Sequence, residues 1–130
     1  MRSAKLLLDT QVALWWWRDL ARLGPNAQTA IEDGEGILVS SVSAYEIALK
    51  WRLGKLPMID DPLVNFPLLM AQNDFESLAV TELHSLRAGL LPINHRDPFD
   101  RLIAAQALEE GLTVVTCDPQ IAAFGCKVLW

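Results

Sequence analysis

The sequence is poor in cysteine and histidine, and this scarcity excludes several kinds of site. Its 130 residues include 2 Cys and 2 His. Cys117 and Cys126 are too few for a disulfide framework, and they form no metal-binding spacing with His84 and His95. We therefore expect no structural zinc site and no catalytic triad built on Ser or Cys. Both cysteines are expected to be inert core thiols.

Long apolar runs are also missing. The longest, residues 12–17, is far shorter than the about 20 residues that span a membrane. The N-terminal leucines are followed at once by Asp9, which comes too soon for the core of a signal peptide. The sequence therefore predicts a cytoplasmic protein without a membrane segment.

Basic residues are in the minority. The chain has 11 Lys and Arg against 16 Asp and Glu, which gives a formal net charge of −5. A protein that coats nucleic acid through salt-dependent contacts needs a basic face, so the charge argues against this function. An enzyme that touches a polyanion locally is still compatible with the charge. The positions of the acidic residues therefore matter most.

What the sequence contains is a regular alternation of short apolar runs and helical patterns. Strands are predicted at residues 4–8, 37–39, 75–80, 112–116 and 127–129. Helices are predicted at residues 12–23, 27–33, 43–53, 63–73, 81–87 and 98–110, with a short one after Asp118-Pro119. Gly24-Pro25 is expected to stop the first helix, and Pro67 to kink or break the fourth. This order predicts one three-layer α/β domain over residues 1–130, with a mostly parallel sheet covered on both faces.

Four acidic residues fall where strands lead into helices. Asp9 follows the first strand, and Asp118 follows the strand at 112–116. Glu46 and Asp100 lie in the first turns of predicted helices. Ligands of open α/β sheets bind outside the carboxyl ends of the strands, so these four side chains are expected to meet at one edge.

Each acid, taken singly, also has a structural interpretation. Asp97 and Asp118 precede prolines, as helix N-caps do. Ser43 and Glu46 have the spacing of a capping box, and Asp100 suits the positive end of its helix. Asp9 is the acid that capping explains least, because a charge beside a buried strand needs a partner.

Taken together, the four acids favour a metal site. Several carboxylates at one edge cannot all stay ionised without a compensating cation. Oxygen ligands suit Mg²⁺, or Mn²⁺ in its place, better than zinc. A hard cation held by carboxylates activates water and neutralises charge in phosphodiester hydrolysis, so this reaction is the favoured one.

Four segments resemble the acidic motifs of the PIN-domain family, and most closely those of VapC-type toxin ribonucleases of toxin–antitoxin modules. They are Leu6-Leu-Leu-Asp-Thr10, Ser43-Ala-Tyr-Glu-Ile47, His95-Arg-Asp-Pro-Phe-Asp-Arg101 and Thr116-Cys-Asp118. The stretch from Arg96 to Ala107 is the most specific part. Tyr45 stands where Trp often precedes the Glu, and Gln11 where His often follows Asp-Thr. Neither departure removes a carboxylate.

The resemblance implies a Mg²⁺-dependent endoribonuclease that an antitoxin holds inactive, and a second copy of the toxin as partner in a homodimer. The family's acidic residues correspond to Asp9, Glu46, Asp100 and Asp118. The implied roles are metal binding by Asp9, Asp100 and Asp118, with Glu46 binding metal or positioning the attacking water.

Other residues are weaker candidates. Arg101 is the first choice for holding an RNA phosphate, and Lys50 the second, although solvation and ion pairing are the favoured explanation for any single one of these residues. Thr10, Thr116 and Asp97 are expected to support the site or to cap helices. Trp15, Trp16 and Trp17 are consecutive on a helix and cannot share one narrow face, so one ring is expected at the surface or an interface.

Two other functions remain as alternatives. A haloacid-type phosphatase also begins with a strand and an Asp, but it needs a second Asp where this chain has Gln11. A non-catalytic interaction or receiver-like module would use the acids as caps. A receiver would need an acidic pair after the first strand, and none is present there. Metal-dependent RNA cleavage separates the nuclease from both.

Overall fold

The structure is a computed structural model, and it describes residues 5–92 and 96–130. The strands are β1 (Leu6–Leu8), β2 (Leu38–Ser40), β3 (Glu76–Leu78), β4 (Thr113–Val115) and β5 (Lys127–Leu129). The helices are α1 (Thr10–Arg18), the short 3-10 turn η1 (Leu20–Arg22), α2 (Pro25–Asp33), α3 (Ser41–Arg52), α4 (Pro62–Gln72), α5 (Glu82–Leu90), α6 (Pro98–Glu110) and α7 (Pro119–Ala123). Within these residues, no helix is long and apolar enough to cross a membrane.

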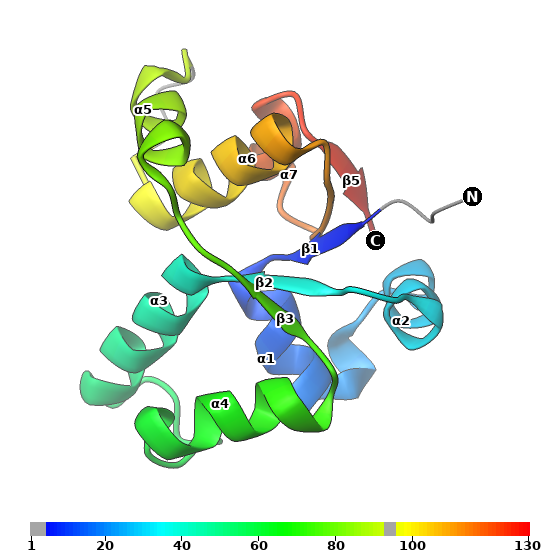
Figure 1. The fold of residues 1–130 in the computed structure, drawn as a ribbon. Coiled ribbons are helices and arrows are strands. Elements are labelled where there is room, and N and C mark those ends of the chain that lie inside the picture. Colours follow the sequence, from blue (N-terminus) through cyan, green and yellow to red (C-terminus); the bar gives the residue numbers. More distant parts are fainter. Residues whose placement is uncertain (1–4, 93–95) are drawn as a thin grey trace.

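The five strands form one sheet in the order β3-β2-β1-β4-β5, and every neighbouring pair is parallel (Figure 1). In the central strand β1, Leu7 pairs with Leu38 on one side and with Val114 on the other. The chain therefore continues from β1 to β2 on one side, while β4 lies on the other side. This topological switch opens a crevice at the carboxyl ends of β1 and β4.

Both faces of the sheet are covered because alternate strand residues point to opposite sides. Leu6 and Leu8 pack with α1, α2 and α4, while Leu7 packs with α6 and α7 on the other face. Figure 1 shows these two groups of helices on either side of the strands, with α5 outside α6. The expected α/β architecture with a parallel sheet is confirmed.

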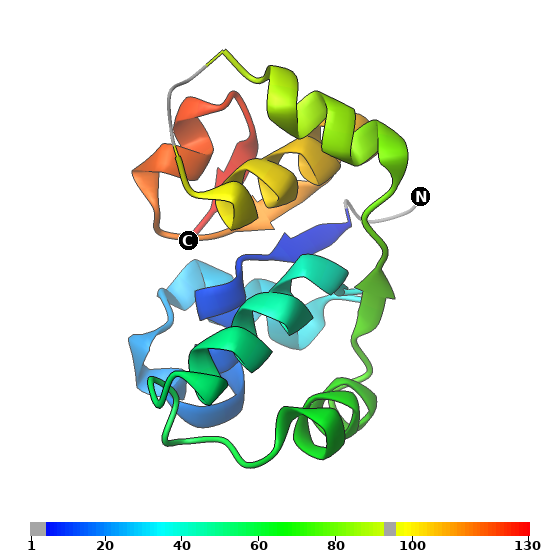
Figure 2. The same ribbon diagram turned by 90° about the vertical axis from the view of Figure 1, so that its left-hand side faces the viewer.

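Helix α3 connects the two halves of the molecule. It packs against α1 through Leu14 and Ile47, and it also contacts α4 and α6 (Figure 2). Since α1 follows β1 directly, this packing holds the start of α3 next to the carboxyl end of the central strand. The crevice therefore has walls from both halves of the chain.

The expected first helix is shorter than its apolar pattern suggested. Helix α1 ends at Arg18, because Asp19 adopts φ −153° and ψ 65°, and the turn η1 follows. Gly24-Pro25 does not stop a helix but begins one, with Pro25 in the first turn of α2, where its missing N–H costs nothing.

Helix α4 runs from Pro62 to Gln72, so Pro67 does not break it, and the expected kink stays a prediction. The capping box expected in α3 was wrong. The N-cap of α3 is Ser40, whose hydroxyl accepts a hydrogen bond from Val42 N, so Ser43 and Glu46 do not form a capping box. Ser43 lies inside the helix instead.

The three rings of the tryptophan triplet are all partly buried, so none is fully exposed, and the expected place of one ring at an interface stays a prediction. All three rings are partly buried against the core that contains β1. Trp15 contacts Trp130, Trp16 donates its indole N–H to Asn73 Oδ1 at 3.0 Å, and Trp17 packs edge-on against Phe66. These contacts come from different segments around α1, so rings that point in three directions can all be packed.

Candidate active site

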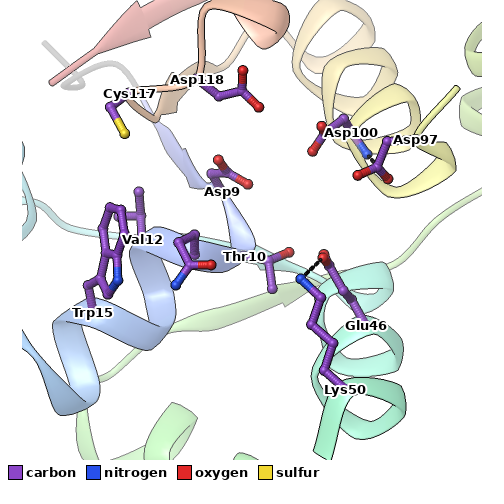
Figure 3. A pocket seen from close by; sticks show the side chains of 11 residues that line it. Asp9, Thr10, Val12, Trp15, Glu46, Lys50, Asp97, Asp100, Cys117 and Asp118 are labelled. Atoms are coloured by element: carbon purple, nitrogen blue, oxygen red, sulfur yellow. Dashed lines mark hydrogen bonds and ion pairs between the residues drawn. The ribbon is translucent and has the colours of Figure 1, made fainter. Parts of the chain in front are cut away.

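Five carboxylates line one pocket of about 260 Å³ at the carboxyl end of β1 (Figure 3). They come from the end of β1, from α3, from the start of α6 and from the start of α7, and they are Asp9, Glu46, Asp97, Asp100 and Asp118. The four acids singled out in the sequence therefore lie together, as the order of strands and helices required. Asp97, expected only to support them, lines the same pocket.

Asp9 is held by the neighbouring strand. Its backbone N–H donates to Val115 O at 3.1 Å, and its Oδ2 accepts a hydrogen bond from the Thr116 hydroxyl at 2.8 Å. The same hydroxyl oxygen accepts from Asp118 N at 3.0 Å. Thr116 therefore connects two of the acids through one oxygen atom, which agrees with its expected supporting position.

The environment of Asp9 disfavours its charged form. Burial raises the pKa of Asp9 to about 6, although the hydrogen bond from Thr116 acts in the opposite direction. The nearby charges of Asp100, Glu46 and Asp118 raise this pKa further. The carboxylates are thus close enough to repel one another, and the pocket gains by binding a cation.

Two of the acids also cap helices. Asp118 Oδ1 accepts from Gln120 N at 2.9 Å at the start of α7. Asp97 Oδ1 accepts from Phe99 N at 2.9 Å and from Asp100 N at 3.4 Å at the start of α6. Both capping predictions are confirmed. The caps fix the helix starts that carry the acids, so capping and site formation are compatible.

Glu46 and Thr10 have polar partners on the wall formed by α1 and α3. Glu46 Oε2 forms an ion pair with Lys50 Nζ at 2.7 Å, one helical turn away. The Thr10 and Ser43 hydroxyl oxygens lie 2.7 Å apart in a buried hydrogen bond. This bond joins the start of α1, next to Asp9, to the turn of α3 that carries Glu46.

The sequence profile of the PIN domain matches residues 6–125, which includes all the strands but β5 and every pocket acid. The chain belongs to the PIN-domain family. The chain is also 31% identical over 117 residues to Ribonuclease VapC22 from Mycobacterium tuberculosis, a match that covers 89% of this chain and 88% of that protein.

Solved structures share the fold of this PIN domain. The DNA-bound VapBC structure from Salmonella typhimurium matches with a TM-score of 0.67 and 18% identity, covering 98% of both chains. VapBC2 from Rickettsia felis, bound to a DNA fragment from their promoter, matches with a TM-score of 0.64 and 15% identity, covering 96% of this chain and 97% of that one. The PIN-like fold expected from the acidic motifs is confirmed.

Arg101 does not reach the pocket of this PIN domain, contrary to its ranking as the first phosphate candidate. Its Nε donates to Ala88 O at 2.9 Å, and its Nη2 donates to Leu91 O at 2.7 Å and to Gly89 O at 3.4 Å. These oxygens are the last carbonyls of α5 and the one just after it, which have no partner within the helix. The structure thus uses the guanidinium to hold the end of α5. Among the described residues, Lys50 is the only cationic side chain that lines the pocket.

Two residues that line the pocket and one beside it were missed or misjudged in the sequence. Ser43, next to the pocket, is predicted as part of a capping box, although its place one turn before Glu46 puts both on one helix face. Trp15 and Cys117 line the pocket, and Cys117 is exposed rather than a core thiol. Cys126 fits the expectation better, since it is half-buried and burial raises the pKa of its thiol to about 11.

The chemistry of the pocket fits a hard divalent cation. The acidic side chains offer carboxylate oxygens, and one of them is buried among the charges of the others. Within residues 5–92 and 96–130, no three Asp, Glu, His or Cys side chains lie close enough together to hold a metal ion. Binding would therefore draw the carboxylates inward.

Proposed function

We propose that this PIN domain is a metal-dependent endoribonuclease and acts as the toxin of a toxin–antitoxin pair. The observation that carries the proposal is the convergence of Asp9, Glu46, Asp100 and Asp118 on one pocket, with Asp9 desolvated among the other charges. The similarity to Ribonuclease VapC22 supports RNA as the substrate. Hydrolysis of a phosphodiester bond needs the charge compensation that such a pocket provides once it is loaded.

Each side chain has a part in this proposal. Asp9, Asp100 and Asp118 would hold Mg²⁺, or Mn²⁺ in its place, and Glu46 would bind the same ion or orient the attacking water. The bound ion would supply a more acidic water and a positive charge opposite the phosphate. Thr116 holds Asp9 and Asp118 in place relative to each other. Thr10 binds Ser43 on α3, the helix that carries Glu46.

Protein partners are part of the proposal too. The fold relatives include VapBC complexes, which supports a cognate antitoxin for this chain. Large apolar side chains are exposed on α4 and α5, among them Leu63, Val64, Leu86 and Leu90. Such surfaces favour association with an antitoxin and with a second copy of the chain. A toxin that cuts cellular RNA would work in the cytoplasm.

The test is cleavage of a structured RNA by the purified protein in Mg²⁺ and in chelator. We expect cleavage with Mg²⁺ or Mn²⁺ and none in chelator. Asp9→Asn is expected to lower the rate at least about 1000-fold, because it removes a charge that the cation needs. Asp33→Asn makes the same substitution at an exposed position at the end of α2, and it should cleave like the wild type.

A non-catalytic module remains the alternative, and the caps made by Asp97 and Asp118 are the observations that favour it. It predicts no cleavage under any metal condition. Folded Asp9→Asn protein that still cleaves at the wild-type rate would equally overturn the assignment of the pocket. Circular dichroism establishes that each variant is folded.

A further inference from the structure

The ion pair between Glu46 and Lys50 lies inside the candidate site. The two charged atoms are 2.7 Å apart, and both residues line the pocket (Figure 3). The Glu46 side chain is only 10% exposed, whereas that of Lys50 is 39% exposed. An ion pair between two exposed residues contributes little to stability, but here one partner is buried beside other acids.

Lys50 therefore compensates negative charge where a metal would otherwise do so. Asp9, Asp97, Asp100 and Asp118 face the same pocket, and among its described lining residues no other side chain is cationic. Glu46 directs its carboxylate to Lys50, which keeps that carboxylate on the α3 side of the pocket (Figure 3). This agrees with the finding that no three described acids are close enough to hold a cation.

We propose that Lys50 changes partners during the reaction cycle, a proposal that rests on the function proposed above. Without metal, its ammonium group holds Glu46 and competes with a divalent cation for that carboxylate. With a cation held by the carboxylates, the ammonium group of Lys50 would leave Glu46 and contact a phosphate oxygen of the RNA. Metal binding would thus break the ion pair between Glu46 and Lys50, and the released ammonium group would then bind the substrate.

The chemistry of lysine suits such an exchange. Its charge sits at the end of a flexible four-carbon stem with three rotatable donors, so it can leave one oxygen for another without fixed geometry. The partial exposure of Lys50 leaves room for this movement. Arg101 cannot replace it, because its guanidinium donates to carbonyls of α5 and Leu91.

The first experiment measures Mn²⁺ binding by calorimetry without RNA. Lys50→Met keeps most of the length of the side chain and removes its charge, and it should bind Mn²⁺ about fivefold or more tightly than the wild type. Arg52→Met is the control, because Arg52 lies exposed on the same helix outside this pocket, and its Mn²⁺ affinity should stay within about twofold. Lys50→Gln should reproduce the gain of Lys50→Met.

A double-variant cycle separates competition for Glu46 from simple charge repulsion. In a Glu46→Gln background, Lys50→Met should no longer tighten Mn²⁺ binding, because the carboxylate that both cations seek is absent. A gain that persists in this background would overturn the proposal, since Lys50 would then act only as a distant charge. Unchanged or weaker Mn²⁺ binding by Lys50→Met would overturn it as well.

The second experiment measures steady-state RNA cleavage at saturating Mg²⁺. Lys50→Met should raise KM about fivefold or more with a smaller change in kcat, and Lys50→Arg should restore part of the loss. An unchanged KM would overturn the transfer to phosphate. If the wild type cleaves no RNA, the proposed function fails and the transfer with it, whereas Mn²⁺ binding still decides by itself whether Lys50 competes for Glu46.

Discussion

Charged side chains in the pocket and those between α5 and α6 have opposite kinds of neighbours. Between the two helices, His84 Nε2 donates to Glu110 Oε1 at 2.9 Å, and Arg87 pairs with Glu109 at 3.0 Å. Arg101 donates to the carbonyls of Ala88 and its neighbours. In the pocket, Asp9 instead lies near the like charges of Asp100, Glu46 and Asp118, and Glu46 is paired with a lysine.

This difference distinguishes charged side chains that stabilise the fold from those that are kept for a ligand. A charge whose neighbours are opposite charges or carbonyls stabilises the fold, and its removal should cost stability. A charge that faces like charges, as Asp9 does, is kept at a cost to the metal-free fold, which is typical of a site that awaits a ligand. Stability measurements on variants of the two regions should therefore differ in sign.

The largest effect on stability is expected from Arg101→Met. This variant leaves the last carbonyls of α5 without their charged donor, so the free energy of unfolding should fall by about 2–4 kcal/mol. Urea denaturation measures it. Arg87→Met is the control, because its ion pair with Glu109 is largely exposed and should contribute at most about 1 kcal/mol. Equal losses in the two variants would remove the contrast between the buried and the exposed donor.

The second prediction concerns the pH dependence that Asp9 imposes. Because its pKa is raised to about 6 in the folded protein, the folded state binds the proton more tightly than the unfolded chain. The contribution of Asp9 to stability is therefore present below about pH 4 and is lost as the pH rises through 6. Without metal, this loss amounts to about 3 kcal/mol.

Urea denaturation in chelator between pH 4 and pH 8 tests this point. Asp9→Asn keeps an oxygen that can accept from Thr116 but has no charge to titrate. The wild type should therefore lose stability relative to Asp9→Asn across this range and be the less stable protein at pH 7. If the free energies of unfolding of the two proteins changed in parallel with pH, the pKa of Asp9 would not be raised in the folded state.

A smaller effect is expected at Asp100. In chelator at neutral pH, Asp100→Asn should be more stable than the wild type by about 1 kcal/mol, because it relieves repulsion in the pocket. Added Mg²⁺ should raise the melting temperature of the wild type more than that of the variant. Thermal melts with chelator and with Mg²⁺ decide this. A variant that melts lower in chelator and responds equally to Mg²⁺ would place Asp100 with the structural charges.

An effect of similar size is expected at the hydrogen bond between Thr10 and Ser43. Ser43→Ala leaves a buried hydroxyl without its partner and should cost about 1–2 kcal/mol. Thr10→Val with Ser43→Ala should cost less than the sum of the two single changes, because no unpaired hydroxyl remains. Additive losses would show that the two hydroxyls act independently.

The sequence predicted the acids well because their positions follow from local rules. A strand end, a proline and a first helical turn are readable over a few residues, and the parallel order then brings Asp9, Glu46, Asp100 and Asp118 to one edge. The caps at Asp97 and Asp118 were predictable for the same reason. The family resemblance added the chemistry proposed for these positions.

Contacts between distant segments could not be read in the same way. Arg101 was ranked for phosphate binding because it adjoins Asp100, but its partners lie at the end of another helix. Trp15 packs against Trp130, which lies far along the chain, so its packing cannot be predicted from its position on the helix. At α3, the N-cap was predicted at Ser43 but lies at Ser40, because either serine fits an N-cap and only the backbone conformation decides between them.

The hydrogen bond from Thr116 to Asp9 spans 107 positions of sequence. A chain emerging from the ribosome exposes Asp9 early, whereas Thr116 and Asp118 are added only after β2, α3 and α6 have been synthesised. Until β4 pairs with β1, Asp9 lacks both Thr116 and Asp118. The pocket thus cannot assemble on a fragment that ends before Asp118, so translation itself delays the proposed cleavage until β4 and the start of α7 have been added.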